Sequence, residues 1–391
     1  MKISMIEPVS SHGGMNYYDY GLMKGFSNNN CNVTLYTSCP LNFDISQYSN
    51  LNVKYFYEGI YSGKNKIKRF FKYFYGTVLA LKDSNKNGAQ AIHFQVFAIS
   101  VLEIIVLCLI KVFHFPVVVT VHDVESFNKT NAKGFTKFFY CHVDKIIVHN
   151  KISYNVLCES VKLYKYAQKI INNTHIIHHG SYIGMLYDKM NKVAAKQSFG
   201  INQDCFTFLF FGQIKQVKGL DILLQSLAKV VKNNTNNKVK LIIAGKVWKD
   251  DFSIYQNIID DNNLSDYIIL EVKYIRDDDV VKYYSAADCI VLPYKKIFQS
   301  GVLLMAQSYK IPILVSDLPG MMEIVQDGEN GFVFHSDDYK DLADKMSKII
   351  KLSDFEIKEI VEQGYKKLQS DYSWDIIAKQ QLTVIAEMLR H

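Results

Sequence analysis

The sequence lacks the cysteine patterns that define disulfide-stabilised and zinc-binding proteins. Its seven cysteines are odd in number and dispersed, and no two of them form a Cys-x-x-Cys pair. Such a set is typical of reduced, buried thiols in a cytosolic protein. A strong charge imbalance is also missing, because 45 Lys and Arg residues stand against 38 Asp and Glu residues, a net charge of +7. This mild basic balance gives no indication of a nucleic-acid partner, but it suits an anionic partner such as a nucleotide phosphate or an acidic lipid headgroup.

Long apolar runs are missing too. The most apolar stretch, residues 98–113, is interrupted by Glu103 and Lys111, whereas a membrane-spanning helix needs roughly 18 to 20 apolar residues. Near the start of the chain, Glu7 and Pro8 come too early for the apolar core of a signal peptide. We therefore expect a cytoplasmic protein, either soluble or attached to the inner face of the plasma membrane.

What the chain does have is a regular alternation of strand and helix patterns. Val- and Ile-rich runs separated by helical patterns indicate parallel sheets covered on both faces, and the alternation restarts after residue 200. At 391 residues the chain is about twice the usual domain size. We predict the α/β class, with two Rossmann-like, doubly wound parallel-sheet domains facing a central cleft. These are an N-terminal domain over residues 1–190 and a C-terminal domain over residues 191–370. A last helix over residues 371–391, capped by Ser373, is expected to pack on the first domain.

In open parallel sheets, ligands bind outside the carboxyl ends of the strands. The first such loop carries Gly13 and Gly14, which open a helix whose N-terminal amides could bind an anion; a plain tight turn is the alternative. The loop is not a G-x-G-x-x-G fingerprint and no acid closes the next strand, so a dinucleotide cofactor is disfavoured.

Two loops of the second half are stronger candidates. In the first, Gly212 ends a buried strand, and Lys215 and Lys218 precede the next helix, an arrangement that suits a diphosphate. The alternative is two solvated lysines. In the second, Gln299, Ser300 and Gly301 open an apolar helix, and Gly320 is expected beside them after the next strand. The alternative there is that both segments are ordinary turns between strands and helices.

Histidines follow the strands of the first half. They are His93, His122, His149, His178 and His179. We expect several of them to converge on one edge of the sheet; the alternative is that each is an isolated polar residue at a strand end. A metal site is disfavoured because no Cys, Asp or Glu stands at zinc-ligand spacing. The acidic run Asp277–Asp279 is interpreted as the first turn of a helix rather than a metal site.

A basic and aromatic stretch over residues 63–76 could lie on a membrane surface. It interleaves five basic residues with five aromatic ones: Lys64, Lys66, Lys68, Arg69 and Lys72 with Phe70, Phe71, Tyr73, Phe74 and Tyr75. Such helices bind at membrane surfaces, and inward packing of the aromatic rings is the alternative.

Taken together, these residues resemble family 4 of the retaining glycosyltransferases, over nearly the whole chain. The most specific segments are "FFGQIKQVKGLDILL", "AADCIVLPY", "SGVLLMAQSYKIPILVSDLPGMMEIVQDGENGFVF" and "SWDIIA". The start, "IEPVSSHGGMNYYDYGLMKGF", resembles members that act on bacterial surface polysaccharides. The resemblance implies the GT-B fold and a nucleotide-sugar donor.

The resemblance also implies roles for individual residues. His122 and Lys218 would be catalytic, His122 near the transferred sugar and Lys218 on the diphosphate. Gln213 stands where most members have an arginine, so Lys215 could compensate. The full implied donor-binding set is Gly14, Gly212, Gln213, Lys215, Lys218, Tyr274, Ile275, Gln299, Ser300, Gly301 and Val302. The implied acceptor side is Gly13, His93 and Asp123.

The expected reaction moves a sugar from a UDP- or GDP-sugar to a lipid-linked oligosaccharide or polysaccharide, with retention and without a metal or other cofactor. Its expected context is the biosynthesis of capsule, O-antigen or exopolysaccharide. Ile297 and Met305 occupy positions where the family commonly has two glutamates, so sugar and ribose selectivity cannot depend on those carboxylates here. Two alternatives stay open: a non-catalytic partner that binds nucleotide sugars, and a GT-B sugar-nucleotide epimerase.

Overall fold

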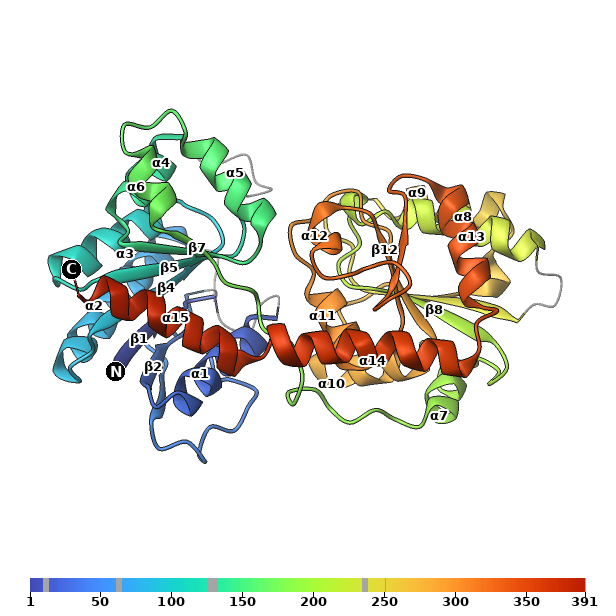
Figure 1. The fold of residues 1–391 in the computed structure, drawn as a ribbon, viewed down its shortest axis with the longest axis horizontal. Coiled ribbons are helices and arrows are strands. Elements are labelled where there is room, and N and C mark those ends of the chain that lie inside the picture. The colour runs from blue at the N-terminus through green and yellow to red at the C-terminus, as the bar shows by residue number, and fades with distance from the viewer. Residues whose placement is uncertain (10–13, 61–64, 125–132, 234–237, 250, 391) are drawn as a thin grey trace. The chain divides into compact units, whose positions relative to one another are not determined.

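The computed structural model describes residues 1–9, 14–60, 65–124, 133–233, 238–249 and 251–390. The chain divides into two compact units, which are coloured along the chain in Figure 1. Unit 1 combines Met1–Gly180 with Tyr372–His391, and unit 2 is Ser181–Asp371.

The junction between the units lies about ten residues before the predicted boundary at 190. The reason is that residues 181–190 hydrogen bond to unit 2. The amide of Tyr182 donates to Ser308 Oγ at 3.1 Å, and the amide of Met190 donates to Ser285 Oγ at 3.0 Å.

Unit 1 contains a parallel sheet of seven strands in the order β3-β2-β1-β4-β5-β6-β7. The strands are β1 (Lys2–Ile6), β2 (Asn32–Tyr36), β3 (Leu51–Lys54), β4 (Ala91–Val96), β5 (Val117–Val121), β6 (Lys145–Val148) and β7 (Thr174–Ile176). The central strands β4 and β5 are buried along their whole length, as expected for a sheet covered on both faces.

Helices cover both faces of this sheet. They are α1 (Met15–Asn28), α2 (Lys66–Lys86), α3 (Val101–Val112), α4 (Lys133–His142), α5 (Lys151–Val161), α6 (Ala167–Asn172) and α15 (Trp374–Met388). Helices α1 and α15 pack side by side (Figure 1). The contact is so close that a Cβ atom on Gly21 or on Gly180 would lie 2.2 Å from Trp374 Cε2, so both positions need glycine. As predicted, Ser373 caps α15, because its side chain accepts a hydrogen bond from the Ile376 amide at 3.4 Å.

Unit 2 contains a parallel sheet of six strands in the order β10-β9-β8-β11-β12-β13. The strands are β8 (Phe206–Phe211), β9 (Val239–Ala244), β10 (Ile268–Glu271), β11 (Cys289–Leu292), β12 (Ile313–Ser316) and β13 (Phe332–Phe334). The helices are α7 (Lys192–Gln197), α8 (Leu220–Asn233), α9 (Ser253–Asp261), α10 (Asp277–Ala286), α11 (Gly301–Ser308), α12 (Pro319–Met322), α13 (Tyr339–Ile349) and α14 (Asp354–Asp371). Three aspartates occupy the first turn of α10, as predicted for the acidic run.

Each sheet has one point where the strand order reverses, between β1 and β4 in unit 1 and between β8 and β11 in unit 2. The predicted α/β class with two Rossmann-like parallel-sheet domains is therefore confirmed. Ligands of such sheets bind at the carboxyl ends of the strands that flank the reversal. These positions are the loops after β8 and β11, and the loops after β1 and β4.

All seven cysteines are free thiols. Within the part of the chain that the structure describes, no helix combines the length and the apolar character needed to span a bilayer.

Candidate functional site

In unit 2, the loop after β8 is held against the loop after β11. Gly219 ends the 3-10 turn Gln216–Lys218 with φ of 68°, and a Cβ atom there would lie 1.8 Å from the carbonyl oxygen of Pro293. The amide of Lys295 also donates to the Val217 carbonyl at 2.9 Å. The two loops that flank the reversal point therefore form one rigid structure, and Lys218 lies at its centre.

Lys218 is a half-buried ammonium stacked on an aromatic ring. Its Nζ lies 3.6 Å from the centre of the Tyr294 ring, and Tyr294 is itself buried. Burial lowers the pKa of Lys218 to about 7. Among the described residues no carboxylate pairs with it, whereas the neighbouring Lys295 binds Asp221 at 2.7 Å. A cation that has been moved out of water without a counter-charge is suited to an anionic ligand.

Tyr294 connects Lys218 to the beginning of α11. Burial raises the pKa of the Tyr294 hydroxyl to about 12, and the nearby Ser300 hydroxyl offsets part of this rise. The Tyr294 hydroxyl has no hydrogen-bond partner among the described residues. Sequence reasoning missed Tyr294. Its position two residues after a buried strand, at the carboxyl edge of the sheet, was the available signal.

The N-terminus of α11 lies beside the loop after β8. Buried Ser300 caps the helix by accepting a hydrogen bond from the Leu303 amide at 3.3 Å. A Cβ atom on Gly212 would lie 3.6 Å from Val302 Cγ2, so the two predicted loops are in contact. The first turn of α11 holds no acidic residue, so the helix dipole is available to an anion.

Gly320 lies beside this turn, as predicted, because a Cβ atom on it would lie 2.5 Å from the carbonyl oxygen of Phe298. Gln299 is half-buried within the turn, and Ile297 before it and Met305 in α11 are half-buried as well. The side chains on both sides of the α11 N-terminus are therefore apolar at these two positions.

The other predicted donor residues follow β8 and β10 of the same sheet. Lys215 Nζ lies 5.4 Å from the Trp248 ring centre, and the Trp248 amide donates to the Ile214 carbonyl at 3.0 Å. Gln213 is exposed. Tyr274 and Ile275 follow β10, two strands away from β8, and the Tyr274 side chain is 69% exposed.

In unit 1, histidines gather at the carboxyl ends of β5, β6 and β7. His122 directly follows β5, and its Nδ1 lies 3.2 Å from Nε2 of His149, which directly follows β6. His179, after β7, has its ring centre 5.7 Å from that of His149. Burial lowers the pKa of His149 to about 3 and that of His179 to about 4. Burial, with the neighbouring His149, also lowers the pKa of His122 well below its usual range. His178 lies beside this group, and its Nδ1 donates to the His149 carbonyl at 3.2 Å.

His93 differs from the expectation that it ends a strand on the acceptor side. It is the third residue of β4, pairs with Met5 and Val118, and is fully buried. Its Nε2 bonds to Thr120 Oγ1 at 2.7 Å. An acceptor could not reach this side chain without separating the sheet from its covering helix, so His93 is a core residue.

Residues 7–9 and Gly14 of the loop after β1 are described, and Gly13 lies outside the described residues. Gly14 precedes α1 with φ of 89° and provides no side-chain cap. Asn16, in the first turn, is 2% exposed, yet neither of its side-chain polar atoms has a hydrogen-bond partner among the described residues. Sequence reasoning missed Asn16, since nothing in the pattern distinguishes it from a solvated polar residue. Asp123 is half-buried after His122.

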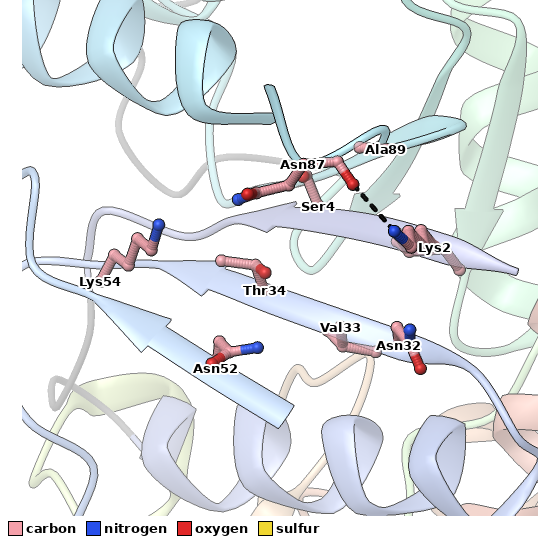
Figure 2. Close-up of a pocket in the computed structure, with 10 residues that line it drawn as sticks. Lys2, Ser4, Asn32, Val33, Thr34, Asn52, Lys54, Asn87 and Ala89 are labelled. Carbon is pink, nitrogen blue, oxygen red and sulfur yellow. Dashed lines mark hydrogen bonds between the residues drawn. The ribbon is translucent and has the colours of Figure 1, made fainter. Parts of the chain in front are cut away.

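A cavity of about 260 Å³ lies elsewhere in unit 1 (Figure 2). It is formed over the polar face of β1, β2 and β3, where Lys2 Nζ donates to the Asn87 carbonyl at 3.2 Å. It includes the first residues of β1 and β2, Lys2 and Asn32, and none of the predicted site residues. Across the described ranges, no group of three or more His, Cys, Asp and Glu side chains is arranged to hold a metal ion.

Comparison with known proteins finds similar sequences among glycosyltransferases. Residues 191–367 match the family model of the group 1 glycosyl transferases. The chain is 26% identical over 278 residues to the capsular polysaccharide biosynthesis glycosyltransferase CapM of Staphylococcus aureus. This match covers 66% of this chain and 68% of CapM. It is also 27% identical over 194 residues to an uncharacterized glycosyltransferase, MJ1607, of Methanocaldococcus jannaschii. This match covers 49% of this chain and 48% of MJ1607.

Solved structures match over the full length. Sucrose-phosphate synthase from Thermosynechococcus elongatus superposes with a TM-score of 0.72 at 18% identity, and covers 100% of this chain and 99% of its own. Anabaena Alr3699/HepE in complex with UDP-glucose superposes with a TM-score of 0.72 at 15% identity, with the same coverage. The fold is that of GT-B proteins, and the sequence matches are to glycosyltransferases.

Proposed function

We propose that the chain transfers a sugar from a nucleoside diphosphate donor to a hydroxyl of a lipid-linked oligosaccharide or a polysaccharide, with retention, in the biosynthesis of a cell-surface polysaccharide. The observation that carries the proposal is Lys218, a desolvated cation at the reversal point of the unit 2 sheet that pairs with no carboxylate of the described residues. The UDP-glucose complex of HepE supports a nucleotide-sugar donor, and the capsular polysaccharide role of CapM supports the pathway.

In the proposed reaction the leaving diphosphate is stabilised by the protein. Negative charge develops on the phosphate oxygens as the bond to the sugar breaks, and fixed donors aimed at that charge lower the barrier. Lys218, with Lys215 beside it, would supply the positive charge. The backbone amides at the start of α11, around Gly301, would supply the remaining donors. No metal ion or other cofactor takes part in this proposal.

The test combines binding with turnover. UDP- and GDP-sugars are first ranked by the rise in melting temperature that each produces. The best ligands are then incubated with the protein and a membrane extract that provides acceptors, and the transferred sugar is measured. Transfer that depends on the acceptor supports the proposal. Binding without transfer would support a non-catalytic partner instead, and conversion of the donor in the absence of acceptor would support an epimerase.

We further propose that α2 attaches the protein to the inner face of the plasma membrane. Five large side chains spaced as one helical stripe are exposed by 36% to 69%: Ile67, Phe70, Phe71, Phe74 and Tyr75. Only Tyr73 of the aromatic residues in this stretch turns inward. The exposed residues Lys66, Lys68 and Lys72 flank the stripe. An apolar stripe bordered by lysines fits a bilayer with acidic headgroups.

Sedimentation with vesicles tests this surface. The variant Lys66→Glu/Lys68→Glu/Lys72→Glu should lose binding to vesicles of phosphatidylglycerol and phosphatidylcholine. Arg69 is left unchanged because its Nε donates to the Ile60 carbonyl at 2.6 Å and supports the fold. A control with three lysines changed on unit 2, Lys232→Glu/Lys348→Glu/Lys351→Glu, should bind like the wild type. Equal binding of all three proteins would exclude α2 as the attachment surface.

A further inference from the structure

A continuous chain of close polar contacts crosses the carboxyl edge of the unit 1 sheet. His149 Nδ1 contacts the Ile177 carbonyl at 3.0 Å, and His149 Nε2 faces His122 Nδ1 at 3.2 Å. His122 Nε2 then contacts Gln95 Oε1 at 2.9 Å, and Gln95 Nε2 donates to Asp19 Oδ1 at 2.7 Å. The side chains of this chain are at most 4% exposed, except for His122, which is half-buried.

The two ends of the chain determine where the hydrogens lie. The Ile177 carbonyl is an acceptor only, so His149 carries a hydrogen on Nδ1. At the other end, Gln95 uses its amino group to donate to Asp19, so its oxygen faces His122. His122 must therefore carry a hydrogen on Nε2.

This arrangement leaves a conflict in the middle. If both rings are neutral, His122 Nδ1 and His149 Nε2 are both bare, and two lone pairs face each other at 3.2 Å. One added proton between these nitrogens would turn the repulsion into a charge-assisted hydrogen bond. The conflict would also disappear if His122 carried its hydrogen on Nδ1, but its Nε2 would then lose the hydrogen bond to Gln95 Oε1.

A reversed Gln95 amide would place its oxygen against Asp19 Oδ1, and two acceptors would face each other unless Asp19 carried a hydrogen on Oδ1. Glu7 and Asp19 are both fully buried, and Glu7 adds to the burial of Asp19 in raising its pKa. Asp19 Oδ1 accepts from Gln95 in either protonation state, provided that any hydrogen lies on Oδ2, which has no hydrogen-bond partner among the described residues. The other titratable groups around the histidine pair are Tyr18, His93, His178 and His179.

We propose that Gln95, oriented by Asp19, is a positioning residue that holds His122 in the Nε2–H tautomer and makes the first added proton shared between His122 and His149. The His122 ring also stacks on Phe97, with ring centres 4.7 Å apart and planes at 14°. Nε2 of this ring thus faces the Gln95 oxygen, and Nδ1 faces the His149 ring. For the proposed function, on which this consequence rests, His122 provides a fixed ring and backbone at the strand end rather than a free acid or base.

The test reads the tautomers directly, by ¹⁵N NMR of protein labelled at histidine, and it compares two substitutions of similar size at one position. Gln95→Glu keeps an acceptor opposite His122, so Nε2–H should remain, and the pair should bind its proton at higher pH than in the wild type. Gln95→Met removes the acceptor, so His122 should switch to the Nδ1–H tautomer, which can donate to His149. Backbone spectra of both variants report whether the fold is kept.

A wild-type protein with Nδ1–H on His122, or a Gln95→Met variant that keeps Nε2–H, would overturn the inference. The measurement needs no substrate. Absence of sugar transfer by the wild type would therefore refute the proposed function and leave this inference standing. Should Gln95→Met fail to fold, the wild-type and Gln95→Glu spectra still decide the tautomer.

Discussion

The affinity for a nucleotide sugar should depend on pH through Lys218. Its pKa is about 7 in the free protein, and a bound diphosphate would raise it, because the negative charge favours the protonated form. A group whose pKa rises on binding takes up a proton, so affinity is greatest below the free pKa and falls as the pH rises above it. A nucleotide sugar is a suitable ligand because its diphosphate is esterified at both ends and has no proton that titrates in this range.

The magnitude follows from the charged fraction of the lysine. With a pKa of about 7, that fraction falls about 90-fold between pH 6 and pH 9, which corresponds to about 2.7 kcal/mol of binding free energy if the complex binds only the charged form. Titration calorimetry at intervals of half a pH unit would measure the decline, and two buffers of different ionisation enthalpy would report the proton uptake.

Three variants isolate the lysine. Lys218→Gln should weaken binding at pH 7 by about tenfold or more, the cost of one charge-assisted phosphate contact, and should remove the pH dependence. Lys218→Arg keeps its charge at every pH, so its affinity should be nearly flat from pH 6 to pH 9. Lys232→Gln removes the same charge from the last turn of α8 and should leave the decline unchanged. A wild-type affinity that stays constant above pH 7, or a decline that persists in Lys218→Arg, would refute the reasoning.

Three stability predictions use the two tryptophans, because Trp248 reports on unit 2 and Trp374 on unit 1. Gly219→Ala should destabilise unit 2 by about 2 kcal/mol or more, because the new Cβ would meet the Pro293 carbonyl and the residue would keep a left-handed backbone. Urea denaturation followed by the fluorescence of Trp248 would detect the loss. A midpoint equal to that of the wild type would contradict the contact. Ser300→Ala should cost unit 2 about 1 kcal/mol through loss of the α11 cap in the same assay, with Ser300→Asp as the control that retains a cap. Trp374→Ala should cost unit 1 about 3 to 5 kcal/mol, measured by circular dichroism, while the Trp248 transition of unit 2 keeps its midpoint.

Much of the fold could be predicted because local pattern and topology agree. Continuous Val and Ile runs such as β5 are typical of parallel strands buried on both faces, and the acids in the first turn of α10 mark its start. The contact between the loop after β8 and the start of α11 was also predictable, since both follow adjacent strands of the sheet. The roles assigned to Lys218 and its neighbours in catalysis stay predictions.

Other features depend on contacts between residues far apart in the chain. His93 is polar and stands in a strand pattern, but only the register with Thr120 shows that it is buried inside the sheet. The exposure of the α2 aromatic stripe could not be predicted either, because its spacing fits an inward face and an outward face equally well. The pairing of His122 with Gln95 requires two neighbouring strands in known register, which one sequence alone does not supply.

The return of α15 to unit 1 has a consequence for biosynthesis on the ribosome. Unit 2 is one uninterrupted segment. Unit 1 is complete only when Trp374 fills the space beside Gly21 and Gly180. Proteins usually complete their domains in the order in which they are translated. Here the later-made unit can finish first, and the earlier-made one acquires its last covering helix only as the end of the chain emerges.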